Sequence, residues 1–161
     1  MKNAFFFLVC NALFLVSCNL NTGVFEKNTA IPGQEWYSSY KPEISFTIKD
    51  TSALYNVYLV LRHSDAYNYN NIWLNLYRKG PDTSYTHQLE VPLANTRENN
   101  SWLGTGMDDI WETRTQINQM PIQFRKAGNY DFVLEQIMRE DPLKHVLNVG
   151  IRIEKTMSNK Q

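Results

Sequence analysis

The chain has 161 residues, and its 16 basic and 16 acidic side chains give a formal net charge of zero at pH 7. A nucleic-acid-binding protein usually shows a basic stripe, so this balance predicts no nucleic-acid partner. Both cysteines, Cys10 and Cys18, lie near the start of the chain, which leaves the remainder without disulfides or thiol chemistry. The sequence is rich in aromatic residues, with eight Phe, nine Tyr and four Trp, and this favours β-structure.

Residues 1–17 have the pattern of a bacterial lipoprotein signal peptide. Lys2 supplies a positive charge, and a short, mostly apolar run follows it. That run is too short to span a bilayer, which takes about 20 apolar residues. Leu15, Ser17 and Cys18 occupy the −3, −1 and +1 positions of a lipobox, so we predict cleavage before Cys18 and lipidation of its thiol. The alternative is an ordinary secretory signal with a chance cysteine near its end.

Cleavage at this point leaves 144 residues with a net charge of −1, which suits one domain. Residues 18–23 are predicted to be the lipidated cysteine and a short tether, which reaches at most about 17 Å at full extension. A single acyl chain holds a protein only marginally, so the expected anchor is a diacylglycerol together with an N-acyl chain on Cys18. We expect residues 24–155 to form the folded domain and residues 156–161 to be a frayed tail.

Alternating apolar side chains predict about eight to ten short strands along the domain, and no helix longer than a turn or two. The expected strands lie at residues 24–26, 34–40, 44–48, 54–62, 72–77, 85–93, 110–117, 122–124, 130–134 and 147–153. The 54–62 segment is apolar on both faces, as expected of a central strand, whereas Pro92 marks a strand end or a sheet edge. Strands spaced about 8–12 residues apart predict an all-β fold, an antiparallel two-sheet β-sandwich of jelly-roll type.

Two segments combine aromatic, acidic and amide side chains: RHSDAYNYNN at 62–71 and SWLGTGMDDIWE at 101–112. Exposed Tyr and Trp side chains stack on sugar rings or anchor protein interfaces. The candidate recognition residues in the two segments are Arg62, His63, Asp65, Tyr67, Tyr69, Trp102, Met107, Asp108, Asp109 and Trp111. For Trp73 and Trp111, a place in the core beneath long loops is the preferred interpretation. Convergence of the two segments on an exposed face would make a recognition site, and burial of both would make them determinants of the fold.

No set of residues points to catalysis, so no enzyme activity and no cofactor are expected. His63, His87 and His145 lack the spacing of metal ligands. Ser64 stands between His63 and Asp65, but sequence neighbours on a strand point to opposite faces and cannot form a triad together. Paired carboxylates suited to glycoside hydrolysis arise by chance among 16 acidic residues.

Asp108 and Asp109 form a weak candidate site for calcium, because they lie in a glycine-containing loop and supply hard oxygen ligands. The EF-hand pattern is missing from this loop. Caps, turn hydrogen bonds or an ion pair with Arg62 or Arg114 are the preferred roles of these two carboxylates. No other metal site is predicted.

Several runs along the chain are unusual enough to compare with known families. They are RHSDAY and YNNIWL at 62–67 and 69–74, GTGMDDIWE at 104–112, LEQIMRE at 134–140, PL at 142–143 and VGIR at 149–152. Together with the lipobox, they resemble the gliding motility lipoprotein family GldH of the Bacteroidota. The resemblance implies a lipid-anchored cell-envelope lipoprotein, a non-enzymatic accessory of the gliding machinery and of the type IX protein secretion tied to it. It carries over no catalytic or ligand-binding residue.

The residues after Cys18 bear on location and partners. Surface lipoproteins of that phylum usually carry acidic residues just after the cysteine, and residues 19–23 (NLNTG) have none. The expected location is therefore the outer membrane, facing the periplasm. The expected partners are the membrane, through the lipid on Cys18, and envelope proteins of the motility and secretion apparatus. The alternative function is a carbohydrate-binding β-sandwich lipoprotein, with a glycan as its partner.

Overall fold

The computed structural model describes residues 23–81 and 83–156. Three predictions fall outside these residues: the signal peptide at 1–17, the lipidation of Cys18 with most of its tether, and most of the tail at 156–161. No helix in the described part is long and apolar enough to cross a membrane.

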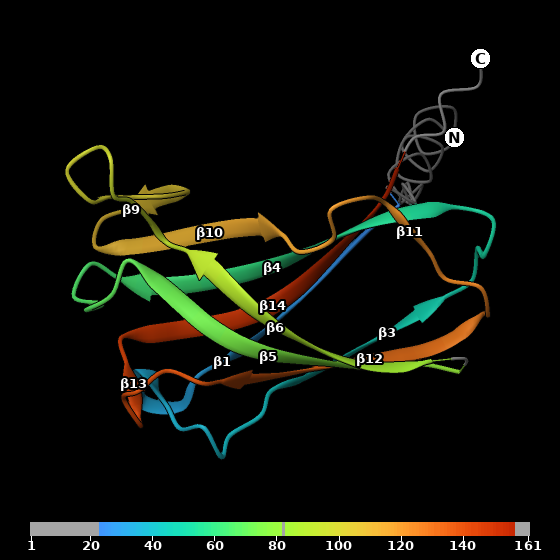
Figure 1. Cartoon of the computed structure of the whole chain (residues 1–161), viewed down its shortest axis with the longest axis horizontal. Helices are drawn as coiled ribbons and strands as arrows, with labels where there is room; N and C mark the ends of the chain where they lie inside the picture. Colours follow the sequence, from blue (N-terminus) through green and yellow to red (C-terminus); the bar gives the residue numbers. More distant parts are fainter. Residues whose placement is uncertain (1–22, 82, 157–161) are drawn as a thin grey trace, which may run out of the picture.

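The described chain forms a sandwich of two main antiparallel sheets, which confirms the predicted all-β fold (Figure 1). One sheet has six strands, in the order β1 (Val24–Ala30), β14 (Val146–Lys155), β4 (Leu54–Ser64), β10 (Ile110–Gln116) and β9 (Thr105–Met107), with β11 (Ile122–Gln123) also paired to β4. The other has four, in the order β3 (Glu43–Ile48), β12 (Gly128–Gln136), β5 (Asn71–Lys79) and β6 (Ser84–Pro92). Two small ribbons pair β2 (Glu35–Trp36) with β13 (Leu143–Lys144) and β7 (Ala94–Asn95) with β8 (Ser101–Trp102), and η2 (Pro32–Gln34) is a 3-10 turn.

The core lies between the two sheets and is built from every second residue of the facing strands. β3 buries Ile44, Phe46 and Ile48, while the residues between them are exposed. β12 and β5 follow the same alternation. β4 is central, with β14 on one side and β10 on the other, as its apolar sequence on both faces predicted. The period-2 pattern that predicted these strands therefore also identified their buried faces.

The predictions for residues 34–40 and for Trp73 were wrong. Residues 34–40 contribute only the short strand β2, because the chain curls and the indole Nε1–H of Trp36 donates to the carbonyl of Tyr40 at 2.8 Å. Trp73 was expected in the core and is instead 36 % exposed. It lies on the outer face of β5, between the buried side chains of Ile72 and Leu74.

β14 contains an irregularity that changes which side chains face the core. Its pairing with β4 shifts register between Val146 and Asn148. An extra residue in one strand reverses the inward and outward order of the side chains around it. Val146 is consequently fully buried and Leu147 is only half-buried, so the alternation predicted for 147–153 begins at Val149.

β6 is an edge of the four-stranded sheet, and only its second half is covered. Leu89 and Val91 are buried, whereas Tyr85 and His87 on the same face are exposed. The sequence had placed all four on one apolar face. Pro92 is the last residue of this edge strand, in agreement with its predicted position.

The two ends of the sandwich are defined by the course of β4. The N–H of Lys155 donates to the carbonyl of Gly23 at 2.8 Å, so the first and last described residues lie side by side at what we call the proximal end. β4 starts there at Leu54 and ends at Ser64. At about 3.3 Å per residue, Ser64 lies about 30 Å away, at what we call the distal end.

Candidate recognition surface

β4 and β10 bring the two predicted segments together at the distal end. In their antiparallel pairing, Arg62 lies opposite Glu112 and His63 lies opposite Trp111. Beyond the strands, the N–H of Asp65 donates to the carbonyl of Asp109 at 2.8 Å. The two segments therefore converge.

This convergence divides the candidate residues between the two faces of the six-stranded sheet. Neighbouring residues on a strand point to opposite faces, and residues opposite one another on paired strands share a face. Arg62 and Met107 accordingly belong to the outer face, whereas His63 and Trp111 belong to the face toward the other sheet. Of these four side chains, those of Arg62 and Met107 are exposed, whereas His63 is buried and Trp111 is half-buried.

The unusual run from Gly104 to Trp111 is explained by the hairpin of β9 and β10. Met107 pairs with Ile110, and Asp108 and Asp109 make the two-residue turn, with Asp108 at φ +56°. Gly106 lies opposite Trp111, and a Cβ at Gly106 would lie only 2.9 Å from the indole ring. The ring therefore covers the glycine, and Trp111 acts as a half-buried brace of the hairpin.

A shallow groove of about 330 Å³ lies on the outer face beside this hairpin. Its lining residues are Arg62, Thr105, Gly106, Met107, Ile110, Glu112, Leu147 and Asn148. Met107 is 78 % exposed and Ile110 is 39 % exposed. We call Met107, Ile110 and Leu147 the distal patch.

The charges beside the distal patch already have partners. Arg62 Nε lies 2.5 Å from Glu112 Oε2, and the other oxygen of Glu112 lies 2.8 Å from Arg114 Nη2. Because the charges are paired, the apolar side chains are the part of this surface that would gain most from being buried by a partner. Exposed apolar side chains with a paired polar rim are typical of a protein-binding surface.

On the inner side, Tyr67 and Trp102 form an aromatic cluster with His63. The His63 ring lies 4.5 Å from the Trp102 ring and 5.3 Å from the Tyr67 ring, measured between centroids, and it is fully buried. Burial lowers the pKa of His63, against a hydrogen bond from its Nδ1 to the carbonyl of Ser64. Burial likewise raises the pKa of Tyr67, whose hydroxyl donates to the carbonyl of Asn71 at 3.1 Å. His63 and Tyr67 are therefore core residues.

A second groove, of about 360 Å³, opens over the rim of this cluster. Its lining residues are Tyr67, Asn68, Tyr69, Asn70, Ala94, Asn100 and Trp102. Tyr69 is half-buried and donates its hydroxyl proton to Glu140 Oε2 at 2.9 Å, and Trp102 is half-buried as well. Aromatic faces beside amide groups suit sugar rings and their hydroxyls, so we call this the amide-aromatic groove.

The carboxylates of the two segments do not gather. Asp65, Asp108 and Asp109 are all exposed, and Asp108 and Asp109 lie in the hairpin turn. Within the described ranges, no group of three or more His, Cys, Asp or Glu side chains lies close enough to hold a metal ion. The geometry at Asp108 and Asp109 thus fits the turn role better than the calcium alternative.

Sequence reasoning missed two residues of the distal patch, Ile110 and Leu147. Ile110 was assigned to a strand, and nothing in the sequence said that its side chain would face outward at the sheet's end. Leu147 was assigned to the core and is released from it by the register shift in β14. A break in the alternation, with Val146 and Val149 both apolar around Leu147 and Asn148, was the available signal.

Comparisons with known proteins bear on the family of this chain. A family model described as GldH lipoprotein matches residues 23–153. A protein of Christiangramia forsetii named gliding motility lipoprotein GldH homolog is 25% identical over 166 residues, which cover 97% of this chain and 99% of that protein. The gliding motility lipoprotein GldH of Flavobacterium johnsoniae is 26% identical over 155 residues, which cover 91% of this chain and 93% of that protein.

Among solved structures, the chain is similar to the VP2 subviral particle of infectious bursal disease virus, with 14% sequence identity and a TM-score of 0.29. The likeness covers 80% of this chain and 29% of that chain. A TM-score this low supports no conclusion about fold or function.

Proposed function

This chain belongs to the GldH lipoprotein family, and we propose that it is a lipid-anchored, non-enzymatic accessory protein of gliding motility and of the associated type IX secretion machinery. The observation that carries the proposal is the distal patch, an exposed apolar surface beside neutralised charges. Its work is to hold an envelope protein at a fixed distance from a membrane.

The anchor in this proposal is the lipid on Cys18. The chain enters the sandwich at Gly23, so a tether of about five residues keeps the proximal end within about 17 Å of the lipid. The distal patch then stands about 30 Å further out, at the other end of β4. The lack of acidic residues after Cys18 favours the periplasmic face of the outer membrane.

The non-enzymatic role rests on how the acidic side chains are used. Glu135 accepts a hydrogen bond from Tyr77 and lies 2.7 Å from Lys41 Nζ, and these partners lower its pKa to about 2. Glu112 is bound by Arg62 and Arg114. Carboxylates held ionised by fixed cations serve poorly as general acids, which need a raised pKa.

Two methionines of equal exposure test the distal patch. Met107 is 78 % exposed and Met120, in the loop between β10 and β11, is 77 % exposed. We expect Met107→Glu to lower the amount of envelope protein recovered with the lipoprotein after mild crosslinking by about fivefold, equivalent to a contact worth about 1 kcal/mol. Met120→Glu should leave recovery unchanged, since that loop lies away from the patch. Equal recovery with both variants excludes the patch as the contact.

The accessory role and the anchor have their own tests. Recovery of the lipoprotein alone, under conditions that preserve other envelope complexes, contradicts the accessory role. A Cys18→Ala protein should accumulate without lipid and lose its membrane location. Normal membrane binding and motility of cells carrying Cys18→Ala would instead show that the anchor is assigned to the wrong residue.

A second candidate function is glycan binding in the amide-aromatic groove, favoured by three amide side chains beside Tyr69 and Trp102. Titration of intrinsic tryptophan fluorescence with bacterial glycans measures it directly. Trp102→Ala and Tyr69→Ala should each abolish the binding. Sugar binding that survives both substitutions excludes this groove.

A further inference from the structure

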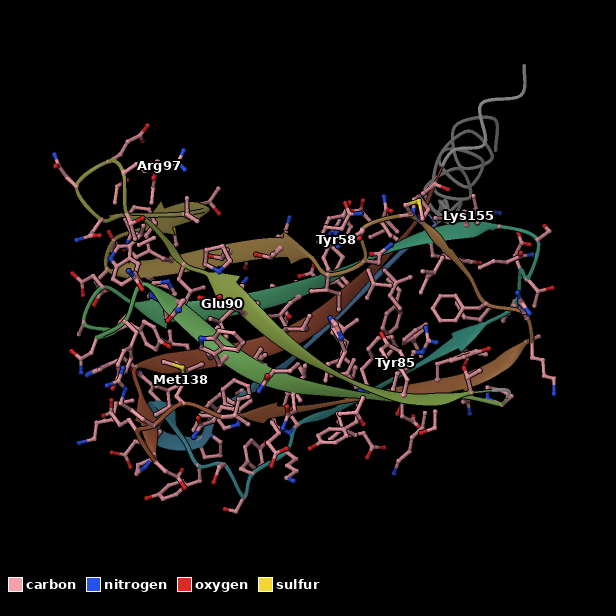
Figure 2. All side chains as sticks on the ribbon, in the orientation of Figure 1. Tyr58, Tyr85, Glu90, Arg97, Met138 and Lys155 are labelled. Carbon is pink, nitrogen blue, oxygen red and sulfur yellow. The ribbon has the colours of Figure 1, made fainter. Side chains whose placement is uncertain are left out.

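β6 offers a free edge on which another strand can pair. It is the last strand of its sheet, and no described strand pairs with the side away from β5. Residues 84–88 (SYTHQ) are exposed and include no Lys, Arg, Asp or Glu. Natural proteins usually protect such an edge with charges, prolines or bulges. Such protection is confined here to the far end, where Glu90 and Pro92 lie; Tyr85 and Glu90, labelled in Figure 2, lie near the two ends of this edge.

The hydrogen-bonding direction along β6 follows from its turn. The N–H of Gly80 donates to the carbonyl of Thr83 at 2.9 Å, so the pair formed by these two residues is a hydrogen-bonded one. Bonded and non-bonded pairs alternate along an antiparallel ladder. The N–H groups of Ser84, Thr86 and Gln88 therefore point away from β5, toward solvent. The backbone nitrogen of Pro92 points the same way as those of Ser84, Thr86 and Gln88, so its missing N–H removes no hydrogen bond to β5.

A pocket of about 250 Å³ opens between the sheets directly beside this edge. Its lining residues are Val57, Arg78, Tyr85, Ile117, Asn118, Ile122 and Phe132. Arg78 lies opposite Tyr85 and continues the inner face formed by Leu74 and Leu76. A guanidinium therefore occupies a position where the strand pattern otherwise places an apolar side chain.

Arg78 has no acidic partner among the described residues. Within the same residues its Nε is buried without a hydrogen-bond acceptor, and its one polar contact is a long one, from Nη2 to Thr83 Oγ1 at 3.5 Å. The guanidinium lies over the Tyr85 ring at 4.3 Å and 5.8 Å from the Phe124 ring. Arg78 as a whole is half-buried. A partly buried cation without an anion gains from a partner, and a carboxylate is its best match because it accepts two parallel N–H bonds.

The edge and the pocket together select one kind of ligand. In a strand added to β6, alternate side chains point to the inner face, as Tyr85 and His87 do. We propose that β6 binds an extended peptide segment of a partner protein as an added strand, and that an acidic side chain of this segment binds Arg78 in the pocket. Apolar residues two positions before and after the acidic one would rest against Ile117 and Ile122. This site shares no residue with the distal patch.

A second copy of the chain does not meet these requirements. Two β6 strands paired with each other would share their inner faces, which carry Tyr85, His87, Leu89 and Val91. None of these side chains is acidic, so Arg78 would remain unpaired in both copies. An extended acidic peptide satisfies both the edge and the cation.

A displayed library of random heptapeptides, selected against the full-length lipoprotein in detergent, tests the proposal. We expect peptides with one Glu or Asp flanked at ±2 by apolar residues. The best peptide should bind at least about tenfold tighter than its Glu→Gln or Asp→Asn version, equivalent to about 1.4 kcal/mol. Arg78→Met should remove this preference, and Arg78→Lys, which keeps the charge but not the two-pronged geometry, should reduce it.

Thr86→Pro tests the strand pairing, because it removes an N–H that points to solvent and leaves the bonds to β5 intact. It should abolish peptide binding, whereas Thr86→Val should not. Selection of no acidic peptides overturns the proposal, as does an acidic preference that persists in Arg78→Met. Two further outcomes would overturn the proposal. If the wild-type protein self-associates and Thr86→Pro does not, the edge binds a second copy of the chain. If phosphate binds in a way that requires Arg78 and is unaffected by Thr86→Pro, the pocket is a simple anion site. Met107→Glu should leave peptide binding unchanged, which separates this test from that of the distal patch.

Discussion

Replacing Gly104 by alanine should loosen the distal hairpin. Gly104 has φ +91°, and a Cβ there would lie 2.0 Å from the carbonyl oxygen of Glu112 and 2.9 Å from its carbonyl carbon. These atoms belong to the backbone of β10, so they cannot rotate aside as a flexible side chain does. The positive φ costs an L-residue about 1–2 kcal/mol, and the forced shift of the neighbouring strand adds about 1–3 kcal/mol.

Gly33 is the matched control for this substitution. It has φ +61°, and no described atom lies within 4 Å of the position that a Cβ would take. Gly33→Ala therefore carries only the conformational cost. Urea unfolding followed by tryptophan fluorescence should give a loss of about 2–5 kcal/mol for Gly104→Ala and about 1–2 kcal/mol for Gly33→Ala.

Hydrogen exchange locates the effect of Gly104→Ala. Amides of β9 and β10 should exchange faster in this variant, while those of β3 and β12, in the other sheet, should stay protected. Losses of unfolding free energy that agree within about 0.5 kcal/mol for the two glycine variants would refute the argument from close packing.

Buried and paired titratable groups make stability depend on pH in two ways. Burial lowers the pKa of His63 in the folded protein. As the pH falls below about 6.5, His63 is therefore protonated in the unfolded chain before it is protonated in the folded one. The free energy of unfolding then drops by up to about 1.4 kcal/mol per pH unit until the folded pKa is reached. Urea unfolding at pH 7.5 and pH 5.5 should show this loss in the wild type and a smaller one in His63→Phe. Lys41 and then Tyr77 lower the pKa of Glu135 to about 2. The ionised Glu135 therefore stabilises the fold fully above the usual pKa of a glutamate, and this stabilisation is lost as the pH falls to about 2. Glu135→Gln should therefore melt below the wild type at pH 7 and at the same temperature near pH 2.

Local alternation predicted the strands and the core where both sheets cover a strand fully. β3 and β12 pair with each other and have their apolar faces buried along the whole length. β6 has the same alternating sequence but lies at the edge of its sheet, and Tyr85 and His87 in its first half stay exposed. A sequence pattern reports which face of a strand is apolar, whereas burial of that face depends on what lies across from it.

The candidate site was recognisable by its composition and not by its geometry. The two segments stood out as aromatic and acidic, and their convergence depends on Arg62 lying opposite Glu112, a register that no local signal specifies. A one-residue slip would have placed His63 outside and Arg62 inside. Sequence reasoning therefore found the segments but did not separate the core residue His63 from the surface residue Met107.

The outer face of the six-stranded sheet carries its charges in alternating order. Contacts of 2.5 to 3.7 Å join Arg62, Glu112, Arg114, Glu26, Arg152 and Glu154 into one series. Opposite charges neutralise one another along this series, and each exposed pair is worth at most about 1 kcal/mol. The face therefore exerts little attraction on a charged partner, and binding at the distal patch must gain chiefly from burying apolar area, at about 25 cal/mol per Å².

The two proposed surfaces should therefore differ in how strongly salt affects them. The guanidinium of Arg78 lacks a described anion, so its attraction for an acidic peptide is screened as the ionic strength rises. Raising NaCl from about 50 to about 500 mM should weaken peptide binding at β6 several-fold, because the screening length falls from about 14 Å to about 4 Å. Recovery of the partner held by Met107 and Ile110 should change little over the same range, since apolar burial is not screened. A parallel loss at both surfaces would mean that the paired charges beside the distal patch, and not its apolar side chains, hold the partner.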